Sequence, residues 1–153
     1  MESIRLMLFA AAFFLASDGV VGARYLITWS YQDLLDKSDL AVIAMPTATG
    51  DTKERTRLEQ FWPAIGVETT FAVSAVLKGD KAIKDFVLHH YRVERPYPNG
   101  PILVSFSTSQ EKTYLLFLVR QSDGRYAPTA GQTDPGHLGI SVLGSPPFKG
   151  VSP

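Results

Sequence analysis

Residues 67–91, VETTFAVSAVLKGDKAIKDFVLHHY, decide the fold of this chain. From Val67 to Leu77 the residues divide with a period of two into an apolar face and a more polar face, which indicates a long, half-buried β-strand. The Lys78-Gly79-Asp80 step predicts a turn, because glycine adopts a positive φ at low cost. Residues 86–93 then form the partner strand, so the segment predicts a β-hairpin.

The remaining regular segments extend this pattern to a mainly-β domain. Ser30 followed three residues later by Asp33 predicts the cap of one short helix. Apolar runs separated by glycine or proline predict further strands, and the run at 113–120 is the most apolar of them and is expected at the centre of the sheet. The other expected strands are 39–45, 102–107 (a strand or an extended edge), 125–128 and a last one around 138–142.

A polar stretch, TATGDTKERTRLEQFWPA at 47–64, interrupts this series. It shows no clear hydrophobic period, and the sequence therefore predicts a long connecting loop that serves in binding or moves. Phe61 and Trp62 stand at its far end. This aromatic pair is interpreted in two ways, as a ligand platform or, in preference, as the point where the loop re-enters the core.

The first 23 residues predict a secretory signal peptide. Arg5 precedes an apolar run of 11 residues from Leu6 to Ala16, and small residues stand at the expected cleavage site after Ala23. The run is much shorter than the roughly 20 residues of a membrane-spanning helix. We therefore expect a secreted or periplasmic protein without a membrane span after cleavage, whose residues 24–153 form a single domain.

Composition narrows the class of partner. The chain has 15 basic and 15 acidic residues, and removal of residues 1–23 leaves 14 and 13. Such a balance argues against nucleic acid, which needs a concentrated basic excess. There is no cysteine, so no disulfide staples the domain.

The adjacent His89 and His90 raise the question of a metal site. Neighbouring residues on a strand point to opposite faces, so the two imidazoles are not expected to share one ion. One ring is expected in the core and the other in solvent or a groove. A zinc site built from one of them with His137 and Asp134 was weighed, but a Pro-Gly turn explains the latter segment better.

Other catalytic patterns are not found. No Gly-x-Ser-x-Gly elbow and no glycine-rich phosphate loop occurs, and the acidic residues that would serve a glycosidase stand at turns. The sequence thus predicts no catalytic residue, no metal site and no cofactor.

The order of elements, with SDLAVIA after the short helix, then ETTFAVSAVLKGD and YLLFL, resembles the tissue-inhibitor-of-metalloproteinase and netrin-module superfamily. The resemblance extends from Tyr31 to Val142 and is closest to exported bacterial relatives. It implies a five-stranded OB-like barrel with one short N-terminal helix and long connecting loops. The animal inhibitors begin their mature chain with a zinc-chelating cysteine, and Arg24 stands at that position here, so those inhibitory residues are not carried over.

OB-type barrels commonly bind partners on the face of strands two and three and through the adjoining loops. In this chain those regions carry aromatic and arginine residues suited to stacking and forked hydrogen bonds, namely Phe61, Trp62, Tyr91, Arg92, Arg95 and Tyr97. The sequence therefore predicts an exported, non-enzymatic binding module for a protein or an envelope glycan or peptide. The alternatives are a small metal-dependent hydrolase and a protease inhibitor acting through the 47–64 loop.

Overall fold

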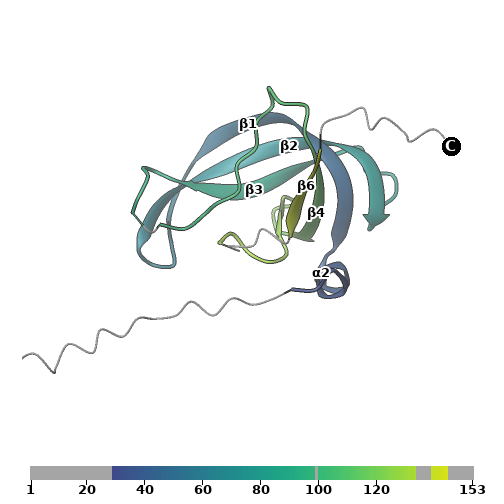
Figure 1. Ribbon diagram of the computed structural model, residues 1–153, viewed down its shortest axis with the longest axis horizontal. Coiled ribbons are helices and arrows are strands. Elements are labelled where there is room, and N and C mark those ends of the chain that lie inside the picture. The colour runs from purple at the N-terminus through teal and green to yellow at the C-terminus, as the bar shows by residue number, and fades with distance from the viewer. Residues whose placement is uncertain (1–28, 99, 134–138, 145–153) are drawn as a thin grey trace, which may run out of the picture.

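The computed structural model describes residues 29–98, 100–133 and 139–144 (Figure 1). Within these ranges the protein is mainly β, with one short helix. The elements are α2 (Tyr31–Lys37), β1 (Leu40–Leu58), β2 (Trp62–Lys78), β3 (Asp85–Val93), β4 (Thr113–Arg120), β5 (Tyr126–Pro128) and β6 (Ile140–Gly144).

Five of the strands form a closed, barrel-like ring in the order β1-β2-β3-β5-β4 and back to β1. The ring closes because Leu40–Ala44 of β1 pair with β4 on one edge while the same strand pairs with β2 on the other. On the opposite side, β3 meets β5 in a parallel pairing at Leu88 and Tyr126. The predicted mainly-β, five-stranded barrel-like fold with one short helix is thus confirmed, and β4 is its central strand, bordered by β1, β5 and β6.

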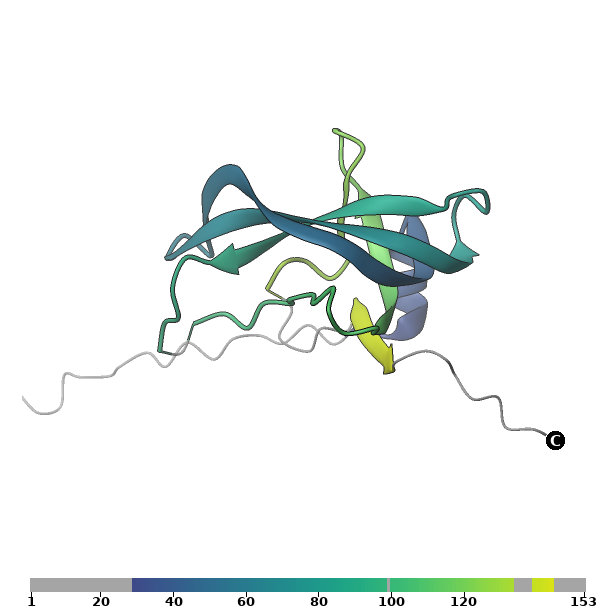
Figure 2. The same cartoon turned by 90° about the horizontal axis from the view of Figure 1, so that it is seen from above.

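The long strands β1, β2 and β3 lie side by side and cross β4 steeply, with α2 beside β4 (Figure 2). The β1–β2 turn projects from the ring on the side away from α2 (Figure 1). The helix begins with the predicted capping box between Ser30 and Asp33, and its Leu34 packs against Ala41 and Phe117 on the outside of the ring.

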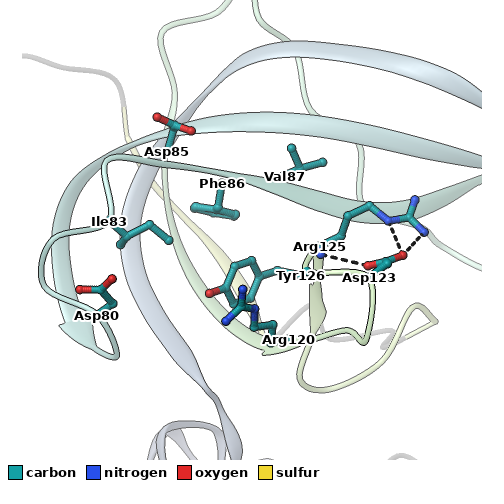
Figure 3. A pocket seen from close by; sticks show the side chains of 10 residues that line it. Asp80, Ile83, Asp85, Phe86, Val87, Arg120, Asp123, Arg125 and Tyr126 are labelled. Atoms are coloured by element: carbon teal, nitrogen blue, oxygen red, sulfur yellow. Dashed lines mark hydrogen bonds and ion pairs between the residues drawn. The ribbon is translucent and has the colours of Figure 1, made fainter.

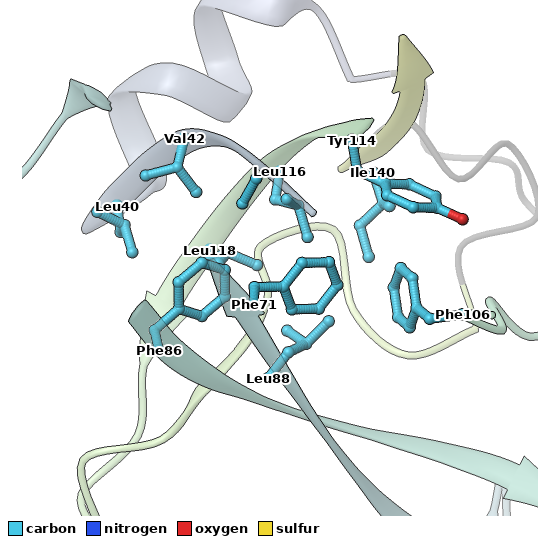
Figure 4. Packing of buried hydrophobic residues seen from close by; sticks show 11 residues of the cluster. Leu40, Val42, Phe71, Phe86, Leu88, Phe106, Tyr114, Leu116, Leu118 and Ile140 are labelled. Carbon is cyan, nitrogen blue, oxygen red and sulfur yellow. The ribbon is translucent and has the colours of Figure 1, made fainter. Parts of the chain in front are cut away.

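The core fills the inside of the ring with buried side chains from β1, β2, β3 and β4 (Figure 4), and Tyr126 of β5 packs against it. Phe71 lies at the centre, fully buried, with its ring stacked on Phe86 at 5.3 Å and edge-on to Phe106 at 5.0 Å. Ring pairs of this kind add about 0.5–1.5 kcal/mol each to the free energy of burial. The predicted division of β2 into two faces is confirmed over Val67–Phe71, whereas Leu77 near its end is exposed.

One of the predicted strands is not found. Residues 102–107, predicted as a strand or an extended edge, form no strand, and this stretch instead carries Phe106 into the core. The last strand, predicted around residues 138–142, is found as β6, which begins at Ile140. The predicted signal peptide at residues 1–23 lies outside the described residues, and no described helix is long and apolar enough to cross a membrane.

The largest correction concerns residues 47–64, where the predicted long loop is wrong. Strand β1 continues without a break to Leu58, and β2 begins at Trp62, so a hairpin replaces the loop. Between Thr52 and Arg57 exposed and half-buried residues alternate, although all are polar. The strand has no apolar face there because this part of the hairpin extends beyond the core.

A bulge in β1 interrupts its regular pairing with β2 within the hairpin. The pairing advances from Asp51 to Arg55 on β1 while it moves only from Val67 to Ile65 on β2, so β1 has two extra residues at this point. The extra residues lie over Gly66, where a Cβ atom would stand 2.6 Å from Thr52 Oγ1 and 2.9 Å from Glu54 Cβ. Because Gly66 has no side chain, Thr52 and Glu54 of the bulge can pack directly against its backbone.

We predict that Gly66→Ala lowers the free energy of unfolding by about 1–3 kcal/mol, the usual cost of forcing extra atoms into a packed site. The matched control is Gly50→Ala in the same hairpin, where a Cβ atom would meet nothing within 4 Å. Urea unfolding of the two variants and the parent checks this. Equal stability of the two variants would show that the bulge does not depend on Gly66.

Candidate functional site

The β1–β2 turn holds two residues in the left-handed conformation. Glu59 has φ 48° and Gln60 has φ 66°, and the N–H of Phe61 donates to the carbonyl of Leu58 at 3.1 Å. Tight hairpin turns favour positive φ at both central residues, usually as Asn-Gly. Residues with a Cβ atom adopt this conformation at a cost of roughly 1–2 kcal/mol each. The turn is therefore strained, and strain of this kind is concentrated at functional positions.

Phe61 leaves this strained turn into solvent. Its side chain is 74 % exposed, the most exposed large hydrophobic residue of the described chain. The expectation that Phe61 returns to the core is thus wrong, because the segment that precedes it is a strand outside the core. Phe61 is thus an exposed aromatic side chain at the end of a projecting hairpin, where it is available for contact with another molecule.

Trp62, Tyr97 and Arg95 form a stack beside the turn. The rings of Trp62 and Tyr97 lie 5.2 Å apart with their planes tilted by 55°, and the Arg95 guanidinium lies 5.2 Å from the centre of the Tyr97 ring. The N–H of Glu94 donates to the carbonyl of Pro63 at 3.1 Å, which ties the segment after β3 to the start of β2. We call Phe61, Trp62, Arg95 and Tyr97 the hairpin-end surface.

The other two predicted site residues are engaged within the protein. Arg92 forms a forked ion pair with Asp51 of β1, in which Nε lies 2.8 Å from Oδ1. The hydroxyl of Tyr91 donates to Glu54 Oε1 at 2.5 Å. Both side chains thus hold β1 against β3, and the structure does not bring them into the hairpin-end surface.

Glu54, His89, Tyr91 and Gln121 form a polar cluster on the outer face of β3. His89 Nδ1 lies 3.2 Å from Gln121 Oε1, and Nε2 lies 2.9 Å from Glu54 Oε2. His89 Nε2 forms no hydrogen bond, so its contact with Glu54 is electrostatic. The hydrogen bond from Tyr91, helped by the nearby charges of His89 and Arg125, outweighs burial and holds the pKa of Glu54 below its usual value. Burial, followed by the Glu54 carboxylate, raises the pKa of Tyr91 to about 12.

The β4–β5 turn closes this cluster from the side. Its Arg125 is paired with Asp123 of the same turn and, at 2.8 Å, with Glu68 of β2. Gln132 donates from Nε2 to the carbonyl of His89 at 3.1 Å. The sequence pattern does not reveal the roles of Glu54, Gln121 and Gln132, because each of them contacts His89 although it lies more than thirty positions away in the chain.

His90 points the other way, into the core. Its Nε2 lies 2.9 Å from Thr69 Oγ1, which in turn meets Thr49 Oγ1 at 2.8 Å, and its ring is edge-on to Phe106. The two histidines therefore diverge across the strand, as predicted. The expectation that one of them is exposed is wrong, since both are 3 % exposed. His89 is covered by Glu54 and Gln121, which the sequence pattern alone did not place there.

Neither histidine is set up for catalysis by the described residues. His89 has no serine, threonine or cysteine partner there, and the Thr69–His90 pair is sealed from substrate because Thr69 is fully buried. The part of the chain that the structure describes holds no group of three or more His, Cys, Asp or Glu side chains arranged for a metal ion. Asp134 and His137, weighed as zinc ligands, lie outside the described residues.

The buried His90 generates a pH prediction. Burial, with the neighbouring His89, lowers the pKa of His90 from 6.5 to about 4. Between these values the unfolded chain binds a proton that the folded protein does not, so stability is full above pH 6.5 and falls as the pH drops towards 4. The slope reaches about 1.4 kcal/mol per pH unit and the total loss about 3 kcal/mol.

Urea unfolding at pH 7, 6 and 5 measures this slope, and His90→Gln, which does not titrate, serves as the comparison. We expect a shallower slope for the variant over this range. NMR titration of the His90 ring provides a second readout. Parallel slopes, or a ring that titrates near pH 6.5, would contradict the assignment.

Comparison with models of known protein families finds no match, and a search of curated proteins finds none either. What the chain does must therefore follow from its own residues and their arrangement.

Proposed function

We propose that the protein is an exported, non-enzymatic binding module that contacts a partner protein through its hairpin-end surface. The observation that carries this proposal is Phe61, held in solvent by a strained turn next to the Trp62–Tyr97–Arg95 stack. A projecting apolar side chain costs solubility and has no role in the core. Its retention beside a preorganised stack is understandable if a partner covers it.

The residue types of this surface favour a protein as the partner. Tyrosine, tryptophan, phenylalanine and arginine are enriched in the central part of protein interfaces, and Trp, Tyr and Arg supply most of the residues that dominate binding energy. Trp62 and Tyr97 hold each other in place before any ligand arrives, so little side-chain entropy is lost on binding. Stacking on these rings also suits a glycan, which is the competing ligand in the test below.

The barrel-like ring adds a second line of support. OB-type folds commonly bind along strands two and three and at the loop between strands one and two. The hairpin-end surface consists of that loop, the start of β2 and the segment that follows β3. A distant relationship to the tissue-inhibitor-of-metalloproteinase and netrin-module superfamily is part of the proposal, and it is supported by the order of the elements along the chain and by the barrel-like ring.

The two alternative functions are less well supported. An inhibitor acting through residues 47–64 would use a hairpin in place of a loop, and deletion of that segment would remove residues 47–58, which are 12 of the 19 residues of β1. A metal-dependent hydrolase would combine one of the paired histidines with His137, but His89 and His90 each have partners inside the protein, and His137 lies outside the described residues.

Export is proposed from the charged, apolar and small-residue order of residues 1–23. We expect the protein recovered from the periplasm or medium of the expressing cell to begin at Arg24. Mass spectrometry of the intact protein measures this directly. Recovery of the uncleaved chain from the cytoplasm would contradict it.

The binding surface is tested by affinity capture from the native extracellular or periplasmic fraction. We expect the Trp62→Ala/Tyr97→Ala double variant and Phe61→Ala each to lose the captured partner protein by at least about tenfold, as for residues that dominate an interface. The control is Tyr31→Ala, which removes an exposed aromatic side chain on α2, away from the hairpin end.

Equal recovery by the parent and the double variant would remove the hairpin-end surface as the binding site. Capture that is abolished by glycosidase treatment of the fraction would instead identify a glycan ligand. Circular dichroism and urea unfolding of each variant confirm that the comparison is made between folded proteins.

A further inference from the structure

A cavity of about 470 Å³ opens where the ring of strands is held together least (Figure 3). Strand β3 meets β5 only at Leu88, so the three preceding residues of β3 have no strand partner on that side among the described residues. The cavity lies beside them, between the β2–β3 turn and the β4–β5 turn. We call it the seam cavity, and it is at the opposite end of β2 from the hairpin-end surface.

The apolar part of the seam-cavity wall is rigid. Phe86 and Tyr126 meet edge-on with ring centres 5.6 Å apart and Ile83 lies beside them, whereas Val87 points to the opposite face of β3 from the buried Phe86 (Figure 3). Phe86 also stacks on Phe71 in the middle of the core. The wall is thus anchored by the core packing, and a ligand that contacts it does not have to order it first.

One side of the cavity offers a cation without an internal partner. The backbone N–H of Arg120 donates to Asp39 Oδ2 at 2.8 Å, but among the described residues no hydrogen bond or ion pair engages its guanidinium group. Arg125, in contrast, is fully engaged by Asp123 and Glu68. Arg120 is therefore the group on this rim that is able to take an anion.

The facing side offers a carboxylate. Asp80 lies in the β2–β3 turn, across Ile83 from Arg120, while Asp85 at the start of β3 points to the opposite face of that strand from Phe86 (Figure 3). Asp80 accepts a hydrogen bond from the N–H of Ala82 through one oxygen, and neither carboxylate is paired with a cation of the described chain. The seam cavity thus presents a positive group and a negative group on its two sides with an apolar wall between them.

We propose that the seam cavity binds a small zwitterionic ligand with an apolar body, of the size of a hydrophobic dipeptide. The ligand carboxylate accepts a forked hydrogen bond from Arg120, its ammonium group faces Asp80, and its side chain lies against Ile83 and Tyr126. A volume of about 470 Å³ falls within the range of roughly 300–1,000 Å³ typical of small-ligand sites. This site is independent of the proposed contact through the hairpin end.

The test uses the dipeptide Ala-Phe, titrated into ¹⁵N-labelled protein and followed by NMR chemical shifts. We expect saturable shifts at Val87, Gly124 and Tyr126 with a Kd on the order of 10⁻⁴ M, which corresponds to an ordinary efficiency for a ligand of this size. Ala-Phe amide and N-acetyl-Ala-Phe lack one charge each, and we expect both to bind at least about tenfold more weakly.

Arg120→Gln is the deciding variant, since its side chain has no structural partner among the described residues and the backbone hydrogen bond to Asp39 remains. We expect it to bind Ala-Phe about tenfold more weakly than the parent and to bind Ala-Phe amide as weakly as the parent does. Arg57→Gln, which removes an exposed arginine of the hairpin, is the matched control and should bind normally. Absence of saturable shifts in the parent, shifts confined to other parts of the protein, or equal affinity of the two variants would each overturn the proposal.

Discussion

The ring of strands depends on four residues of β1 that have backbone partners on both edges. Ala41–Ala44 pair with β4 on one side and with β2 on the other, and Val42 and Ala44 among them also fill the core beside Phe71. Beyond Ala44 the strand keeps its partner β2 but leaves β4. One continuous strand therefore closes the barrel with its first part and builds the projecting hairpin with its second, so the position of the hairpin is set by the core.

The bulge opposite Gly66 then determines what the projecting part contributes. Because β1 gains two residues there, Glu54 reaches across β2 to Tyr91 and His89 on β3. The polar cluster that results ties the hairpin and the β4–β5 turn to the outer face of β3. A buried polar group without a partner would cost about 1–3 kcal/mol, so a cluster of partners is required as soon as His89 is covered. The cluster thus has a structural explanation, and the hairpin end and the seam cavity remain as the proposed binding surfaces.

The sequence predicted those parts of the fold that carry a clear local pattern. The hairpin at 67–93 has alternating residues, the central strand 113–120 is a continuous apolar run, and the helix after Ser30 has a capping sequence. Each of these elements is found. Residues 47–58 are all polar except for two small residues and Leu58, because both faces of β1 there lie outside the core, so the period of two is visible in burial and not in hydropathy. The alternation of side chains along a strand predicted that the two histidines diverge. It could not predict that Glu54 and Gln121 cover His89, because those contacts depend on the bulge and on a turn distant in the chain. Of the six residues of the predicted surface, the structure brings Trp62, Arg95 and Tyr97 together beside Phe61, while Tyr91 and Arg92 contact Glu54 and Asp51 of the hairpin.

Strand β3 relates the two candidate surfaces to each other. It begins at the seam cavity with Asp85, passes the polar cluster at His89, and leads at Val93 into the segment that carries Arg95 and Tyr97. Nine residues of extended chain span about 30 Å, so a small ligand in the cavity and a protein at the hairpin end do not compete for space. The strand between them is held on one edge by β2 and on its outer face by the cluster, and it has little freedom to shift as a unit. Occupation of one proposed surface is therefore expected to leave the geometry of the other unchanged, so that the two would bind their ligands independently.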